Sequence, residues 1–460
     1  MRAKINCSLL IIQSLSAGCN TASKGFCTGF VIIPAGFSHT LHNSTKAEGN
    51  SMKILYIDHH AALPAQGGDC RAVQLAQDWQ RRGDEVTMIT AGYSHQRSKN
   101  RTVHEDLEEQ QAEGISLCFL AAPDYARGVG EYRKSIQVFL KKLYVNAPKL
   151  AERYRPEIII AGSGYPYEFF CAQRIAKIAR GKTVFELREA WPERQRESYP
   201  SEESRLGNCI AEYAMSYDLR NADTVVSFLP GGEQYCREKG TMPARLVILP
   251  PPAPPMAAPK PLKESDAAAL QLLREKYSTL AVYAGPLNAR HLPELLVGAV
   301  GNLQQQGVAA VIAGNGGYKQ LLRRMIRENN WENILLLDAL GERQQHALYQ
   351  AADLIYYGDD RQCQAPYGSY APFLLRLMQN GKPILTATHG EKNDAKQAGC
   401  AIPAGEVTQR GVEEALLQFI GMNGEQRAAM GNRALEALET THSAEQVAQD
   451  YRSALLRLWV

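Results

Sequence analysis

From Met52 almost to its end, the chain alternates short apolar runs with segments of helical length. In the first unit, Lys53–Ile57 is followed by a helical segment that opens after Gly67-Gly68 and ends at Gly83. Glu85–Thr90 is the next apolar run. Repeated βαβ units of this kind place helices on both faces of a parallel sheet. The sequence therefore predicts an α/β protein built from doubly wound parallel sheets.

Further apolar runs of strand length occur in both halves of the chain. They cover residues 115–120, 157–161, 183–187, 224–228 and 245–249, and then 280–284, 309–313, 334–337, 354–357, 383–386 and 401–402. Within the run at 183–187, Phe185 and Leu187 alternate with charged positions. Alternation of this kind is typical of a strand exposed on one side, so we expect this strand near an edge of its sheet.

A proline tract at residues 250–255 separates the two sets of strands. Such tracts act as semi-rigid spacers, and a chain of 460 residues is long enough for two domains with separate cores. We predict a first domain at 52–250, a linker at 251–262 and a second domain at 263–440. Residues 441–460 are expected to form a last helix, for which Ser443 and Gln446 make a capping box.

The first 51 residues differ from the rest of the chain. A basic start, an apolar run at Leu9–Ile12 and small residues before Cys19 resemble a short signal or lipoprotein leader, although Gln13 interrupts the apolar run. Met52, in contrast, begins a segment typical of the first strand of a Rossmann-like domain. We interpret residues 1–51 as a leader-like or non-structural extension, with an upstream start codon as the alternative explanation.

Composition indicates a globular protein in a reducing compartment. The chain is 45% hydrophobic and 22% charged, and its net charge of +3 is too small to indicate nucleic-acid binding. The 10 cysteines are scattered without a C-x-x-C pair, which favours free thiols in the cytoplasm. No apolar run approaches the roughly 20 residues that span a bilayer.

Residues 367–385 carry the most informative motif. They read as a Gly/Ser-containing turn, a short helix ended by Gly381, and a buried strand that opens at Pro383. With the strand expected at 354–357, this arrangement offers free backbone N–H groups and a positive helix end, which suit a nucleotide diphosphate. Any doubly wound protein can contain such a unit, so neighbouring motifs must support the interpretation.

Those motifs fit one family in their order. The segment ending in Gly381-Lys382-Pro383-Ile384 resembles the donor-binding segment of retaining glycosyltransferases of family 4. Matching pieces elsewhere are Tyr283-Ala284-Gly285, residues 311–317, Gly67-Gly68 and residues 185–192, the last of which is similar to enzymes that build bacterial surface polysaccharides. The resemblance covers Met52 to the end. It implies the GT-B fold: two Rossmann-like domains facing across a cleft, with the last helix crossing back onto the first.

The chain departs from the family at one motif. Family members usually carry a Glu-x7-Glu pair, and counting back from Gly381 puts Gly368 and Arg376 at the two positions. The second Glu is expected to bind the donor ribose in the family. An Arg has donors only, so it would instead suit a phosphate or a sugar carboxylate. A solvated position on the helix surface is the alternative for Arg376.

The resemblance also implies where the donor binds. Arg290, in the loop after the strand at 280–284, matches the basic residue that neutralises the departing diphosphate. Gly67 and Gly68 match the glycine loop of the first domain, which faces the donor or the acceptor. The remaining donor-binding candidates are Gly285, Asn288, Gly314, Gly316, Ser369, Tyr370 and Arg376.

Two candidates for catalysis lie in the first domain. Glu186 stands near the carboxyl end of a strand, the edge that faces the ligand in open α/β sheets, and could orient the acceptor hydroxyl. An internal ion pair is equally compatible with its position. His59 follows the first strand and could serve the acceptor as a base. In the family, the leaving phosphate itself is thought to take that proton, so a protein base is not required.

The predicted function is retaining transfer of a sugar from a nucleotide-sugar donor to a glycan or lipid-linked acceptor, in surface-polysaccharide biosynthesis. We expect no metal or other cofactor and no nucleic-acid partner. The basic segment Arg127–Arg155 predicts either a peripheral contact with the inner membrane or a solvated helix face. Loss of both motif carboxylates leaves an inactive GT-B partner or scaffold subunit as the alternative, and a sugar-nucleotide epimerase is a third possibility.

Overall fold

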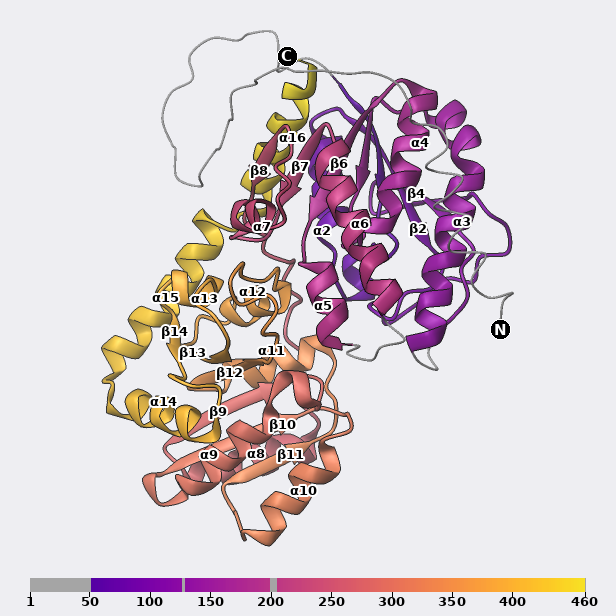
Figure 1. Ribbon diagram of the computed structural model, residues 1–460. Helices are drawn as coiled ribbons and strands as arrows, with labels where there is room; N and C mark the ends of the chain where they lie inside the picture. Colours follow the sequence, from indigo (N-terminus) through magenta and orange to yellow (C-terminus); the bar gives the residue numbers. More distant parts are fainter. Residues whose placement is uncertain (1–50, 126–128, 199–204, 460) are drawn as a thin grey trace.

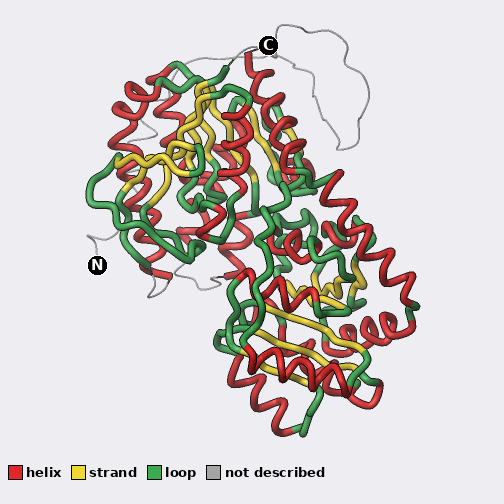
Figure 2. Tube along the Cα trace, turned by 180° about the vertical axis from the view of Figure 1, so that it is seen from behind, coloured by secondary structure: helices red, strands yellow, loops and turns green. Residues whose placement is uncertain are grey.

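The computed structural model describes residues 51–125, 129–198 and 205–459 (Figure 1). Almost all of the predicted leader-like extension lies outside the described residues, as does Arg127. Seen from behind, the two domains lie end to end, and helices flank the strands of both (Figure 2).

The first domain contains an eight-stranded sheet with the order β3-β4-β2-β1-β5-β6-β7-β8. In chain order the strands are β1 (Lys53–Ile57), β2 (Glu85–Ala91), β3 (Glu108–Ala112), β4 (Ile115–Leu120), β5 (Ile158–Ala161), β6 (Lys182–Leu187), β7 (Thr224–Ser227) and β8 (Leu246–Ile248). The α-helices are α2 (Arg71–Arg81), α3 (Val129–Tyr154), α4 (Phe169–Ala179), α5 (Trp191–Ser198), α6 (Arg205–Asn221) and α7 (Gly232–Glu238). Short 3-10 helices are η1 (Pro64–Gln66) and η2 (Pro166–Glu168).

The second domain contains a six-stranded sheet with the order β11-β10-β9-β12-β13-β14. Its strands are β9 (Thr279–Ala284), β10 (Val308–Ala313), β11 (Ile334–Leu337), β12 (Leu354–Asp359), β13 (Ile384–Thr388) and β14 (Ala401–Pro403). Its helices are α8 (Glu264–Lys276), η4 (Ala289–His291), α9 (Pro293–Asn302), η5 (Gln304–Gln306), α10 (Lys319–Glu328), α11 (Glu342–Gln350), α12 (Pro372–Met378), α13 (Asp394–Gln397), α14 (Gln409–Gly421) and α15 (Gly424–Thr440).

Both sheets are buried on both faces. On β1, Leu55 and Ile57 pack against one side of the first domain, and Ile54 and Tyr56 against the other. This alternation explains why parallel strands read as continuous apolar runs in the sequence. The second sheet likewise separates two apolar clusters. Within the part of the chain that the structure describes, no helix is long and apolar enough to cross a membrane.

Two strands differ from expectation. The strand β6 lies between β5 and β7, so the prediction that it lies near an edge is wrong. The charged residue in its alternating pattern, Glu186, is buried inside the domain rather than exposed. The edge strand β3 was not predicted because its sequence is polar, and it pairs antiparallel with β4, whereas the sheet's other pairs are parallel.

Residues 249–263, including the proline tract, form neither helix nor strand. The segment is nevertheless held in place: the Ala253 N–H donates to the His442 carbonyl at 2.8 Å, and the Gln379 side chain donates to the Pro254 carbonyl at 2.5 Å. The linker therefore has fixed contacts with the second domain and with the segment before the last helix.

The last helices, α16 (Ala444–Leu456) and η6 (Arg457–Trp459), lie against the first domain (Figure 1). The Trp79 indole of α2 donates to the Ala448 carbonyl at 2.9 Å. Arg452 Nε lies 2.6 Å from Asp84 Oδ2 in an ion pair that is almost fully buried. The end of the chain thus completes the apolar cover of α2.

Candidate functional site

Two glycine-containing loops lie side by side at the carboxyl edge of the second sheet. The Gly285 N–H donates to the Ala313 carbonyl at 2.9 Å, which joins the loop after β9 to the end of β10. A Cβ on Gly314 would collide with the Gly285 carbonyl oxygen, and one on Gly316 with the Leu287 carbonyl oxygen. Close backbone approach therefore requires glycine at both positions. Asn288 in the same region caps η4 by accepting from the His291 N–H at 3.3 Å.

Three arginines converge where these loops meet the first domain. Arg290 of η4 lies 3.8 Å from the carboxylate of Asp359, the last residue of β12. Arg361, two residues later, donates from Nε to both Asp359 oxygens at 2.9 Å. Its Nη1 also lies 3.9 Å from Glu189 of the first domain, which in turn pairs with Arg194 of α5. We call Glu189, Arg194, Arg290, Asp359 and Arg361 the arginine cluster.

The arginine cluster carries more positive than negative charge. Its three guanidinium groups face two carboxylates, and Arg290 has a side chain that is 44% exposed. Burial and the neighbouring Arg361 lower the pKa of Arg290. Although burial raises the pKa of Glu189, Arg194 and Arg361 outweigh it and hold that pKa below its usual range. The cluster therefore contains ionised pairs plus one cation with capacity to bind an anion.

Arg361 and Arg194 were not identified from the sequence. The strand β12 was expected to end at Tyr357, but it continues to Asp359, which places Arg361 directly after its carboxyl end. Arg194 lies two residues beyond the segment 185–192 that the sequence had singled out. Charged residues just after predicted strand ends were the available signal.

The glycine loop of the first domain contacts the second domain. Gly67 and Gly68 have φ of +70° and +85°, values that favour glycine. The Gly68 carbonyl accepts from Arg376 Nη2 of α12 at 2.7 Å, and Arg376 Nη1 lies 3.4 Å from Glu342. Arg376 therefore joins the two domains in this structure, instead of lying on a solvated helix face.

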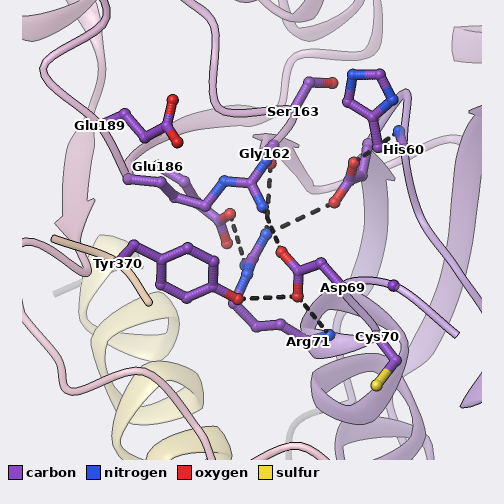
Figure 3. A network of polar contacts seen from close by, with 12 residues as sticks. His60, Asp69, Cys70, Arg71, Gly162, Ser163, Glu186, Glu189 and Tyr370 are labelled. Atoms are coloured by element: carbon purple, nitrogen blue, oxygen red, sulfur yellow. Dashed lines mark hydrogen bonds and ion pairs between the residues drawn. The ribbon is translucent and has the colours of Figure 1, made fainter. Parts of the chain in front are cut away.

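Beside this contact is a second group of charged residues, shown in Figure 3. The Tyr370 hydroxyl donates to Asp69 Oδ1 at 2.8 Å, and Arg188 Nη1 donates to Asp69 Oδ2 at 2.9 Å. Arg71 Nη1 lies 2.7 Å from Glu186 Oε2 and its Nη2 lies 3.6 Å from Asp58. We call Asp58, Asp69, Arg71, Glu186, Arg188 and Tyr370 the polar network.

The polar network is buried and is sealed from two sides. Tyr370 comes from the second domain, and Tyr451 of α16 donates to Glu186 Oε1 at 3.1 Å. Burial raises the pKa of Asp58 to about 6, against the opposing effect of Arg188 and Arg71. Glu186 is 1% exposed. Of the two interpretations of Glu186, the structure shows the internal ion pair, and a role toward the acceptor stays a prediction.

His59 also lies inside the first domain. Its ring stacks on Phe139 at 4.4 Å, and its Nδ1 lies 2.9 Å from the Tyr165 hydroxyl. Burial, together with the charge of Arg97, lowers its pKa to about 3, so the ring is neutral at ordinary pH. A substrate does not reach this ring in the described arrangement. Its role as a base stays a prediction. Ser369, in contrast, is partly exposed at the domain boundary.

Aromatic rings line the carboxyl edge of the first sheet near Arg194. Tyr93 and Tyr125 meet edge to face at 4.8 Å, and Tyr125 lies 5.0 Å from Tyr132. Partial burial of the His95 ring, together with the charge of Arg194, lowers its pKa. Within the described ranges, no group of three or more His, Cys, Asp or Glu side chains is arranged to hold a metal ion.

Comparisons with known proteins were made for both sequence and structure. Residues 66–252 match the family model described as a glycosyl transferase 4-like domain. This match lies in the first domain and agrees with the resemblance seen in the motifs. No curated protein sequence compared with the chain is significantly similar to it.

Solved structures resemble the chain over almost its whole described length. A sucrose-phosphate synthase from Thermosynechococcus elongatus has a TM-score of 0.65 at 15% identity, covering 88% of this chain and 98% of its own. WaaG, a glycosyltransferase of lipopolysaccharide biosynthesis, has a TM-score of 0.58 at 12% identity, with 87% and 99% covered. Anabaena Alr3699/HepE, in complex with UDP and glucose, has a TM-score of 0.57 at 14% identity, with 88% and 99% covered. These likenesses confirm the predicted GT-B fold.

Proposed function

We propose that the chain is a glycosyltransferase that moves a sugar from a nucleotide-sugar donor to a glycan or lipid-linked acceptor. The observation that carries the proposal is the arginine cluster, which lies at the carboxyl ends of strands from both domains and has an excess of positive charge. An anionic diphosphate placed there would meet Arg290 together with the helix and loop N–H groups that follow β9 and β12. The family match over residues 66–252 and the HepE structure with UDP and glucose support the same assignment.

Charge stabilisation is the chemistry that these residues offer. As the sugar–phosphate bond breaks, negative charge accumulates on the leaving diphosphate, and preplaced guanidinium groups stabilise it. Arginine suits this task because it stays charged and its planar fork matches phosphate oxygens. The proposal requires no metal ion. Retention of configuration follows from the family resemblance and is part of the proposal.

The acceptor is proposed to approach along the first domain. The partly exposed rings of Tyr93 and Tyr132, which pack against the buried Tyr125, offer flat apolar faces with polar tips, a surface suited to sugar rings. The outer face of α3 exposes Lys134, Lys141 and other basic residues, while Phe139 and Leu143 of the same helix are buried. This amphipathic pattern supports contact with an anionic membrane surface that presents a lipid-linked acceptor in surface-polysaccharide biosynthesis.

The test is a donor panel measured with the full chain. UDP-, GDP- and CMP-sugars are titrated while thermal unfolding is followed, since a ligand at 100-fold its Kd stabilises a protein by about 2.7 kcal/mol. The Arg290→Gln variant should lose most of the shift for the preferred donor. Arg410→Gln should keep it, because Arg410 is an exposed residue on α14 paired with Glu414. The anomeric configuration of transferred sugar, read by NMR, tests retention.

A second candidate is a GT-B protein that binds a partner without transferring sugar. The contacts that favour it are those of Arg376 with the Gly68 carbonyl and of Tyr370 with Asp69, which join the two domains beside the glycine loop. The absence of both Glu-x7-Glu carboxylates points the same way. A donor panel that gives no thermal shift with any nucleotide-sugar would favour this candidate over the first.

A further inference from the structure

The polar network holds Arg188 less completely than Arg71. Both terminal nitrogens of Arg71 are engaged, by Tyr56 and Glu186 on one side and by the Gly162 carbonyl on the other. The side chain of Arg188 is 9% exposed, and Asp69 is its hydrogen-bond acceptor among the described residues. The Nε of Arg188, like that of Arg71, is buried without a hydrogen-bond partner, so the two arginines differ in their terminal nitrogens. A buried guanidinium with unused donors has capacity for a further acceptor.

Asp69 occupies a site built for an anion. One carboxylate oxygen accepts from Arg188, and the other accepts from the Tyr370 hydroxyl and, at 3.1 Å, from the Arg71 N–H at the start of α2. The N-terminus of this 11-residue helix adds the positive end of its dipole. Burial raises the pKa of Asp69, but Arg71 and Arg188 outweigh it and lower the pKa below its usual range. Asp69 is therefore charged.

Asp69 belongs to the glycine loop, not to the helix. The side chain is 15% exposed, and a Cβ built on Gly67 would meet nothing within 4 Å. Open space thus adjoins the loop at Gly67, two residues before Asp69, whereas a Cβ on Gly68 would collide with the Gln96 carbonyl oxygen. Rotation of the Asp69 side chain would remove the carboxylate from the site and leave Arg188, the Tyr370 hydroxyl and the Arg71 N–H without this acceptor.

We propose that Arg188, Tyr370 and the N-terminus of α2 form a binding site for a carboxylate or phosphate carried by a sugar substrate, and that Asp69 fills it in the free protein. The site is distinct from the arginine cluster, whose excess charge is assigned to the diphosphate. The proposal rests on the proposed function, since it names the class of sugar. The acidic group can belong to the donor sugar or to the acceptor, and the shared chemistry is that of an anion beside a sugar ring.

The test compares acidic probes with neutral ones by calorimetry on the full chain. UDP-glucuronic acid is paired with UDP-glucose, and methyl glucuronide and glucose 6-phosphate are each paired with methyl glucoside. Asp69→Asn should tighten binding of at least one acidic probe by about tenfold, because it removes the competing carboxylate while one charge-assisted hydrogen bond remains available. The affinity for the neutral counterpart of that probe should change less than about twofold. Arg188→Gln should abolish the acidic preference.

Asp78→Asn is the matched control, because Asp78 lies on α2 and pairs with Arg82 away from the site. Equal effects of Asp69→Asn on acidic and neutral probes would overturn the proposal, even if Arg188→Gln does not fold. A response confined to methyl glucuronide or glucose 6-phosphate supports an acceptor-borne anion, and one confined to UDP-glucuronic acid supports a donor-borne anion. If the UDP-sugars bind but Asp69→Asn does not change the preference for acidic probes, this inference fails and the proposed function stands. If no nucleotide-sugar of the donor panel binds while a free acidic sugar responds to Asp69→Asn, the proposed function fails and the anion site stands.

Discussion

The polar network and the arginine cluster use the same residue types at the same kind of place, the carboxyl edge of a parallel sheet, with opposite results. In the polar network, three carboxylates face two arginines, and Asp58 compensates through a pKa raised by burial to about 6. In the arginine cluster the balance is reversed, and Arg290 is 44% exposed. Charge balance and burial, rather than residue composition, separate a group whose charges are paired within the free protein from a group that keeps an exposed cation.

The polar network and the arginine cluster differ in the side chains that shield them from solvent. Tyr451 of α16 closes the polar network from one side and Tyr370 of the second domain from another. No equivalent ring lies over Arg290 among the contacts of the described residues. Substitutions at Asp58 and Glu186 of the polar network should therefore change stability, whereas substitutions in the arginine cluster should change anion binding.

The largest effect is expected from Glu186→Ala. The substitution leaves Arg71, a fully buried guanidinium, without its closest carboxylate, and breaking a buried pair from one side typically costs about 3–5 kcal/mol. The free energy of unfolding, measured by urea denaturation, should fall by roughly the lower end of that range because Asp58 still faces Arg71. Glu85→Ala, which breaks an exposed pair with Lys53, should change it by about 0.5 kcal/mol or less. A small loss for Glu186→Ala would show that the network does not hold the fold.

A pH dependence should distinguish Asp58 within the same network. Its folded pKa, about 6, lies above the ordinary value of 3.8, so the folded state keeps the proton to higher pH than the unfolded state. Its contribution to stability is full below pH 3.8 and is lost as the pH rises through about 6. Asp58→Asn removes this loss, so the stability of the variant relative to the wild type should increase between pH 4 and pH 7, by up to about 3 kcal/mol. Parallel curves for both proteins would contradict the raised pKa.

Glu189→Gln tests whether the arginine cluster binds anions. It removes one of the two carboxylates of the arginine cluster and releases Arg194 and Arg361 toward a ligand. UDP or pyrophosphate should bind about fivefold to tenfold more tightly, and the affinity should fall more steeply with added salt. Calorimetry at two salt concentrations measures both effects. Weaker binding would mean that Glu189 orients the arginines rather than competing for them.

The smallest change is expected from Arg376→Ala. Arg376 donates one hydrogen bond to the Gly68 carbonyl and forms a partly exposed pair with Glu342, contacts worth about 1 kcal/mol together. Hydrogen exchange should become faster in the glycine loop but not in β1. Arg376→Glu should also change donor preference, because a carboxylate can accept from ribose hydroxyls. Unchanged exchange and donor affinity in both variants would reduce Arg376 to a neutral position.

The fold could be predicted because its signals are local. The apolar run at Lys53–Ile57 became β1 without change, and glycines marked the turns where the backbone is close to another loop. The polar strand β3 carried no such signal. The position of β6 could not be deduced from its own alternating pattern, because a buried arginine from α2 supplies the partner that makes an interior Glu186 tolerable.

The candidate site was predictable only in part, for a related reason. Arg290 and the glycines follow strand ends and could be found one by one. The arginine cluster also needs residues 189–194 and 359–361, which meet only when the two domains are assembled. The burial of His59 depends on Phe139 of α3, some eighty positions away in the chain. Long-range packing of this kind leaves no trace in a local motif.

The helix α16 has a consequence for how the protein is made. Its residues Val447, Tyr451 and Leu455 belong to the same apolar cluster as Trp79 of the first domain. A ribosome releases the chain from its N-terminus onward, and domains generally fold as units during synthesis. The domain that emerges first therefore waits for the last helix to leave the exit tunnel before its core is complete. A nascent chain halted shortly before residue 444 would present the uncovered face of α2 to chaperones.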